Sequence, residues 1–166
     1  MTEWSYPGAA ETAARIRSGK LSPVDLVEVC QRRIEILDDS LRAWAAVNRR
    51  AALATARALE RELEEGGLRS PLHGIPVGVK DVYYTAGVKT SAGSKLLEDF
   101  VPEYSATAVQ RLEDAGAVVL GKTECTEFAA NDPAPTRNPW NLDHTPGGSS
   151  SGSAAAFRSG RRWKAR

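Results

Sequence analysis

The stretch that decides the fold is His144-Thr145-Pro146-Gly147-Gly148-Ser149-Ser150-Ser151-Gly152-Ser153. Its proline ends any regular structure before it, and the paired glycines adopt backbone angles closed to other residues, which favours a tight turn lined by hydroxyls. The three alanines at 154–156 then predict the start of a closely packed helix. Backbone N–H groups in such a loop converge on one point and favour an anion or a developing oxyanion there. We therefore expect this loop to hold one catalytic residue.

Two other interpretations of the loop have to be weighed. A flexible Gly/Ser linker has a similar composition, and the loop alone does not distinguish the two. A phosphate-binding loop is disfavoured, because the Gly-Lys-Ser/Thr ending of such loops is missing.

The size and composition are typical of a soluble globular domain. The chain has 166 residues, of which 42% are hydrophobic and 26% charged. No run approaches the roughly 18 apolar residues of a membrane span. The segment 1–6 lacks both a basic start and an apolar core, so no signal peptide is predicted. We expect a cytoplasmic protein that does not bind a membrane.

The cysteines and histidines do not form a metal or disulfide pattern. Cys30 and Cys125 are far apart and outside any metal-ligand spacing, and the chain has only two histidines. Each cysteine is predicted to be a thiol in the core. We expect neither a metal nor an organic cofactor.

The last ten residues, 157–166, differ from the rest in charge. They hold five basic residues and no acidic one, and removing these five from the net charge of +1 leaves −4 for residues 1–156. A basic tail can bind nucleic acid. This one has no repeat and no aromatic interleaving, so we expect no nucleic-acid partner.

Helical periodicity dominates the first part of the chain. Ser22 and Pro23 have the residue types of a helix cap and a first helical position. Apolar residues then recur at helical spacing as far as Leu37. The predicted helices of this part cover residues 8–18, 23–37 and 51–65, and residues 41–47 read as a short connection or strand.

The period changes at residue 71. Short β-branched runs punctuated by glycine and proline predict a strand over 71–83, at or near a sheet edge. The helix predicted over 105–116 is followed directly by an apolar strand over 117–121, which argues for a buried, partly parallel sheet. The remaining predictions are a capped helix over 105–116, a strand over 117–121, a short helix over 123–130 and an irregular segment over 131–145.

Lys80 lies inside the predicted strand. A lysine at a strand end usually extends towards water, whereas a buried lysine needs a partner. A functional role for Lys80 therefore depends on a partner that the periodicity alone does not identify.

Three blocks, taken together and in this order, resemble the amidase signature enzymes. They are Pro71-Leu72-His73-Gly74-Ile75-Pro76-Val77-Gly78-Val79-Lys80-Asp81, then Ala115-Gly116-Ala117-Val118-Val119-Leu120-Gly121-Lys122-Thr123, and finally 136–141 with 146–155. The resemblance covers about residues 8–156, roughly the first third of a typical member. It implies an α/β fold, a truncated N-terminal part of the amidase signature fold, with a mixed β-sheet flanked by helices. The expected division is a partial amidase domain over 1–156 and an aberrant basic tail over 157–166.

The resemblance also implies a Ser-Ser-Lys triad. Lys80 matches its base, and Ser149 matches the bridging serine, which the family holds by a cis peptide bond. Gly147, Gly148 and Ser150 would belong to the oxyanion and substrate loop. Desolvation among the apolar residues of its strand would disfavour the charged form of Lys80, so that the neutral amine can accept a proton. Ser151 stands where many members have glycine, a mild departure from the pattern.

The third member of the triad has no match here. The family places the nucleophilic serine beyond the relay serine, in a stretch that these 166 residues do not contain, so we expect no nucleophile in this chain and no activity from it alone. The parent protein is expected to hydrolyse the C–N bond of a small-molecule amide and could form a homodimer. Two alternatives stay open: the glutaminase-type subunit of a tRNA-dependent amidotransferase, and a non-catalytic module that binds anions or nucleic acid.

Overall fold

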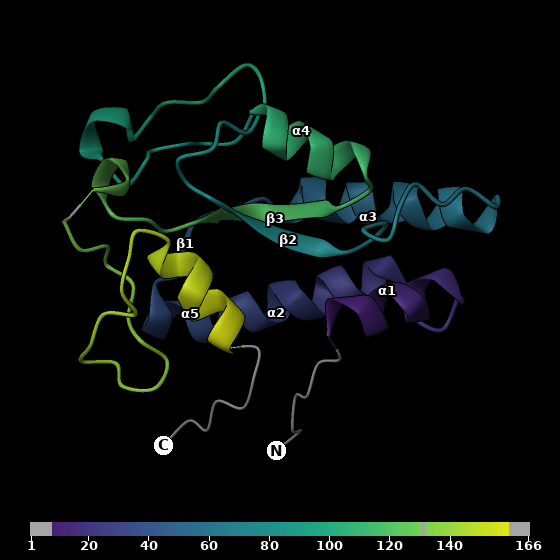
Figure 1. Ribbon diagram of the computed structural model, residues 1–166, viewed down its shortest axis with the longest axis horizontal. Coiled ribbons are helices and arrows are strands. Elements are labelled where there is room, and N and C mark those ends of the chain that lie inside the picture. The colour runs from purple at the N-terminus through teal and green to yellow at the C-terminus, as the bar shows by residue number, and fades with distance from the viewer. Residues whose placement is uncertain (1–7, 131, 160–166) are drawn as a thin grey trace.

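The computed structural model describes residues 8–130 and 132–159, and Figure 1 shows their arrangement. Two short 3-10 turns, Lys95–Leu97 and Glu127–Ala129, lie in the long connections. The helices and strands are, in order, α1 (Ala9–Arg17), α2 (Pro23–Leu41), β1 (Trp44–Val47), α3 (Arg49–Glu64), β2 (Pro76–Lys80), α4 (Thr107–Asp114), β3 (Val118–Thr123) and α5 (Ser151–Ser159).

The sheet of the described residues is small and mixed, with strand order β1-β3-β2. β3 pairs antiparallel with β1 and parallel with β2, which confirms the predicted mixed α/β fold. β2 lies at an edge of this sheet, as predicted, but it begins at Pro76 instead of residue 71. The preceding residues form a turn, in which Gly74 has φ +76° and packs on the ring of Pro23.

Helices flank this sheet and supply most of the core. α2 and α5 both pack against β2 and β3, and α3 packs against α2 and β3 (Figure 1). The largest buried cluster joins α2, α3 and β3 through Val27, Ile34, Ala52, Ala56, Leu59, Val118 and Leu120. Fully burying one aliphatic side chain contributes about 1.5–3 kcal/mol to stability, so a cluster of this size holds the layers together.

Both cysteines are free thiols. Cys125 is buried, as predicted for a core thiol, and Cys30 is partly buried against the core clusters. Burial raises the pKa of Cys30 to about 11.

α2 is longer than predicted, because it continues past residue 37 to Leu41. The run Asp38-Asp39-Ser40 has the composition of a turn, but the Asp38 carboxylate accepts a hydrogen bond from the Ala43 amide at 2.7 Å. Arg42 then ends the helix in the left-handed conformation, with φ 50°. Asp38 therefore supports the last turn of α2 and the chain that leaves it.

Two predictions for the second half of the chain are wrong in detail. Ser105 does not cap α4, because its hydroxyl accepts the Ala86 amide at 3.0 Å and the residue before the helix is Ala106. The helix predicted over 123–130 is a 3-10 turn, in which Phe128 and Ala129 have positive φ angles of 47° and 59°. Its first residue, Thr123, belongs to β3.

The last described residues of the chain belong to α5. α5 continues through Ser159, so the backbone at 157–159 is helical, and the predicted basic tail otherwise lies outside the described residues. In the described part of the chain, no helix has both the length and the apolar character needed to cross a bilayer.

Candidate active site

Lys80 and Ser149 meet between the end of β2 and the loop before α5. Lys80 Nζ donates a hydrogen bond to Ser149 Oγ at 2.6 Å. β2 delivers the lysine at its last residue, where it lies opposite Thr123 of β3. The structure thus supplies the partner for Lys80 that the periodicity could not identify.

The loop around Ser149 is held from the side of β3. The Gly148–Ser149 peptide bond is cis. The Thr126 amide donates to the Ser149 carbonyl at 3.1 Å. A Cβ on Gly148 would lie 2.8 Å from the Thr126 methyl group, so glycine permits this close approach. Thr126 had not been singled out in the sequence, because neither its type nor its spacing points to the serine loop.

The serine loop is ordered, and α5 begins earlier than predicted, at Ser151 instead of residue 154. Ser151 is buried, and its hydroxyl donates to the Gly147 carbonyl at 2.6 Å. The Gly152 amide donates to the Glu124 carbonyl at 2.9 Å. These contacts exclude the flexible-linker interpretation of the stretch.

Other polar groups of the loop bond to their neighbours in the chain. The Gly147 N–H donates to the Thr145 hydroxyl at 3.1 Å. Ser150 is exposed, and among the described contacts its hydroxyl has no hydrogen bond to Lys80 or Ser149. Its carbonyl accepts the Ala154 amide at 3.0 Å in the first turn of α5.

The fully desolvated lysine of this region is Lys122, whereas Lys80 is only partly buried. Lys122 has no exposed surface, and its ammonium lies 3.2 Å from the carboxylate of the equally buried Asp81. Burial lowers the pKa of Lys122, and the Asp81 carboxylate opposes that shift. Both residues stand in the sequence blocks quoted above, but a lysine inside an apolar strand does not reveal which partner it will meet.

Two more titratable groups near the end of β3 have shifted pKa values. Burial raises the pKa of Glu124, and the nearby carboxylates of Asp81 and Asp38 add to this shift. Burial also raises the pKa of the Cys125 thiol, which makes it a poor candidate for a reactive thiolate.

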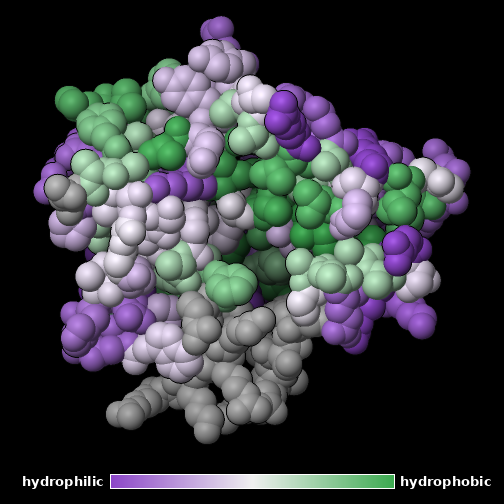
Figure 2. All heavy atoms as spheres, in the orientation of Figure 1, coloured by the Kyte–Doolittle hydropathy of each residue, from purple (hydrophilic) through white to green (hydrophobic). Residues whose placement is uncertain are grey.

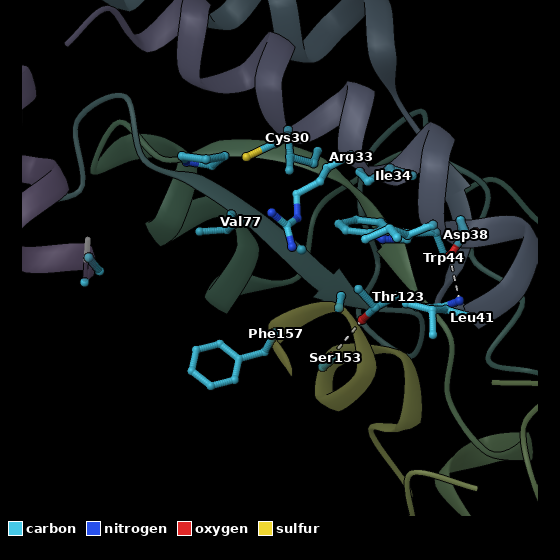
Figure 3. Close-up of a pocket in the computed structure, with 18 residues that line it drawn as sticks. Cys30, Arg33, Ile34, Asp38, Leu41, Trp44, Val77, Thr123, Ser153 and Phe157 are labelled. Atoms are coloured by element: carbon cyan, nitrogen blue, oxygen red, sulfur yellow. Dashed lines mark hydrogen bonds between the residues drawn. The ribbon is translucent and has the colours of Figure 1, made fainter. Parts of the chain in front are cut away.

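A cavity of about 620 Å³ lies between α2, the sheet and α5. Figure 3 shows Cys30 and Arg33 of α2 reaching into it from one side, with Val77 on the strand and Phe157 at the opposite rim. Ser153 on the same wall bonds to Thr123 at 2.8 Å. Neither Lys80 nor Ser149 lines this cavity, so we do not assign it to the substrate.

The molecular surface over the strands is apolar. Figure 2 shows hydrophobic side chains gathered in the middle of the face drawn in Figure 1, with polar residues around them. Within residues 8–130 and 132–159, no group of three or more His, Cys, Asp and Glu side chains is placed to hold a metal ion.

A family model described as amidase matches residues 25–160. The chain therefore belongs to the amidase family, whose members carry the amidase signature.

Curated relatives and solved structures extend the match. The chain is 45% identical over 155 residues to a subunit of the glutamyl-tRNA(Gln) amidotransferase of Streptomyces coelicolor, covering 90% of this chain and 31% of that protein. It is 41% identical to the peptide amidase of Stenotrophomonas maltophilia, with a TM-score of 0.86, covering 92% of this chain and 34% of that one. A bacterial aryl acylamidase of the amidase signature family is 29% identical, with a TM-score of 0.85, covering 93% of this chain and 34% of the other. The chain thus spans about a third of the length of the relatives it matches.

Proposed function

We propose that this chain contributes the base and the proton relay of a serine-dependent amide hydrolase. The observation that carries the proposal is the 2.6 Å hydrogen bond from Lys80 Nζ to Ser149 Oγ. A neutral lysine amine can take the proton of Ser149, and Ser149 can take the proton of a second hydroxyl that attacks the amide carbonyl. The hydroxyl oxygen adds to the carbonyl carbon, and the C–N bond breaks as the leaving nitrogen takes up a proton. Water then hydrolyses the acyl ester, so the products are a carboxylic acid and ammonia or an amine.

The attacking hydroxyl is proposed to lie outside these 166 residues. Ser151 and Ser153 have their hydroxyls engaged by the Gly147 carbonyl and by Thr123. Ser150 is exposed and directly follows Ser149 in the same short loop, so we do not assign it as the nucleophile. The 166-residue chain alone is therefore expected to be silent in amide hydrolysis.

The test is a chimera in which residues 8–156 replace the matching part of the Stenotrophomonas maltophilia peptide amidase. The chimera should release ammonia from a peptide amide, and Lys80→Met or Ser149→Ala should each lower kcat by about 10²–10⁴-fold. The unmodified peptide amidase is the control. Full activity in either variant would falsify the assignment of that residue.

A second experiment tests the silence of the chain itself. The 166-residue chain is treated with a serine-directed fluorophosphonate, and its intact mass is measured. No adduct is expected, because phosphonylation of a serine by this reagent needs an activated nucleophile. A stoichiometric adduct that disappears on changing Ser150, Ser151 or Ser153 would contradict the proposal that the nucleophile lies elsewhere.

A second candidate substrate class is favoured by the curated relatives. The Streptomyces coelicolor relative is named as part of a glutamyl-tRNA(Gln) amidotransferase, so the parent protein would release ammonia from glutamine. The same Lys80 and Ser149 chemistry serves this reaction. Comparing glutamine with a peptide amide as substrates of the protein that contains this chain separates the two. A preference for glutamine that depends on partner subunits supports the amidotransferase.

A further inference from the structure

The buried ion pair of Asp81 and Lys122 is not used by the chemistry proposed above. Lys122 Nζ donates to the Tyr83 carbonyl at 2.7 Å and to the Thr90 hydroxyl at 2.6 Å, and it lies 3.2 Å from Asp81 Oδ1. A pair buried this completely is weak support for stability, because apolar residues of the same volume often do as well. Its presence here is better explained by what it holds in place.

Asp81 is the residue immediately after Lys80, and hydrogen bonds hold both its backbone and its Oδ2. Its amide donates to the Thr123 carbonyl at 3.0 Å, and its carbonyl accepts the Ala92 amide at 3.1 Å. Its Oδ2 accepts the Ser91 amide at 2.9 Å and the Ser91 hydroxyl at 2.7 Å. The ion pair therefore ties the end of β2 to β3 and to the segment 90–92.

Lys80 of β2 and Lys122 of β3 belong to neighbouring residue pairs of the two parallel strands. Val79 lies opposite Lys122, and Lys80 lies opposite Thr123. Because side chains alternate along a strand, Lys80 and Asp81 leave the end of β2 in different directions. Lys80 reaches Ser149, and Asp81 reaches Lys122. Holding Asp81 thus fixes the backbone from which the Lys80 side chain starts.

We propose that Asp81 and Lys122 are positioning residues that keep Lys80 in contact with Ser149. The catalytic meaning of this inference rests on the proposed amide hydrolysis, but the contact itself can be measured without turnover. Neither residue touches the reacting atoms. Their effect is to limit how far the Lys80 amine can move from the relay hydroxyl.

The experiment is a double-mutant cycle on the 166-residue chain, read by trace acetylation of lysines and mass spectrometry. The acetylation rate of Lys80 is compared with that of the exposed Lys95 in the same sample. In the unaltered chain, Ser149→Ala should raise the relative rate for Lys80 by about threefold or more, because the amine loses its partner. In an Asp81→Asn, Lys122→Met background, Ser149→Ala should change the relative acetylation rate of Lys80 by less than about twofold.

A gentler variant protects the test against misfolding. Ser91→Ala removes one bond to Asp81 and keeps the ion pair, whereas Ser91→Thr retains a hydroxyl. Ser91→Ala should reduce the Ser149→Ala effect, and Ser91→Thr should restore it. Thermal melting of each variant reports folding, and a purely structural role would change the melting temperature and leave the cycle additive.

The outcomes are separable from those of the proposed function. The positioning role is overturned if Ser149→Ala raises the relative acetylation rate of Lys80 by the same factor in every background. The backgrounds compared are the unaltered chain, the paired variant (Asp81→Asn with Lys122→Met) and Ser91→Ala. No effect of Ser149→Ala in the unaltered chain overturns it as well. If the paired variant does not fold, the Ser91 pair decides alone. A chimera that does not hydrolyse amides overturns the proposed function and leaves the result of this cycle standing.

Discussion

Lys80 Nζ and Ser149 Oγ lie 2.6 Å apart although 69 residues separate them in the chain. This hydrogen bond is only partly buried, and its remaining exposure to water means that it adds little to the free energy of unfolding. We expect its importance to lie in proton transfer.

The first prediction separates the two kinds of effect. In the chimera, Ser149→Ala should change the free energy of unfolding by no more than about 1.5 kcal/mol, because the lost bond is partly exposed. Amide hydrolysis should nevertheless fall by about 10²–10⁴-fold. Ser153→Ala is the matched control, since it also removes one serine hydroxyl bond but leaves Lys80 and Ser149 in contact. Urea unfolding and ammonia release measure the two quantities, and equal loss of activity in both variants would contradict the assignment.

The second prediction concerns the buried ion pair. Lys122→Met leaves the Asp81 carboxylate buried without its counter-charge and should destabilise the chain by about 3–5 kcal/mol. Adding Asp81→Asn removes that charge and should recover most of the loss. Urea unfolding of the two variants measures the difference. If Lys122→Met alone is as stable as Lys122→Met combined with Asp81→Asn, Asp81 is not held by Lys122.

The third prediction concerns the start of α5. A Cβ on Gly152 would lie 2.2 Å from the Ala43 carbonyl oxygen and 2.4 Å from the Glu124 nitrogen. Both neighbours are backbone atoms, so Gly152→Ala should displace α5 and cost about 1–3 kcal/mol or more. Gly8→Ala is the control, because nothing lies within 4 Å of a Cβ there. Thermal unfolding of both variants gives the comparison, and similar melting temperatures would contradict the close packing.

The fourth prediction is a pH dependence. Burial raises the pKa of Glu124 above the ordinary glutamate value of 4.5. Between pH 4.5 and the raised pKa of Glu124, the folded state binds more protons than the unfolded state. The free energy of unfolding therefore falls as the pH rises through that window. Glu124→Gln removes this contribution, and its stability should depend less on pH there. Urea unfolding at a series of pH values provides the check, and an unchanged slope in the variant would count against a buried Glu124.

Much of the fold could be predicted because its signals are local. Ser22 bonds to the Val24 and Asp25 amides at 3.0 and 3.1 Å, as its place before Pro23 predicts for a helix cap. The parallel pairing of β2 and β3 follows from the order of strand, helix and strand. These features depend on neighbouring residues or on the type of connection, and both are visible in the sequence.

The errors arise where a distant contact overrides the local pattern. The segment 123–130 has helical residue types, but the Glu124 amide donates to the Ala43 carbonyl and the Phe128 amide to the Ala92 carbonyl. These bonds draw the backbone out of a helix. The pairing of Asp81 with Lys122 escaped prediction for the same reason, because periodicity gives a residue's face and not its partner. Lys80 and Ser149 were named together only through the family resemblance.

The strand order β1-β3-β2 has a consequence for synthesis on the ribosome. β3 is the central strand of the three, yet it is made last, so β1 and β2 emerge before the strand that pairs with both. At about 5–20 residues per second, residue 123 follows residue 80 by roughly 2–9 s. During that interval the nascent chain carries two strands whose eventual partner does not yet exist. A chaperone that binds apolar strands would find its target in this brief period of translation.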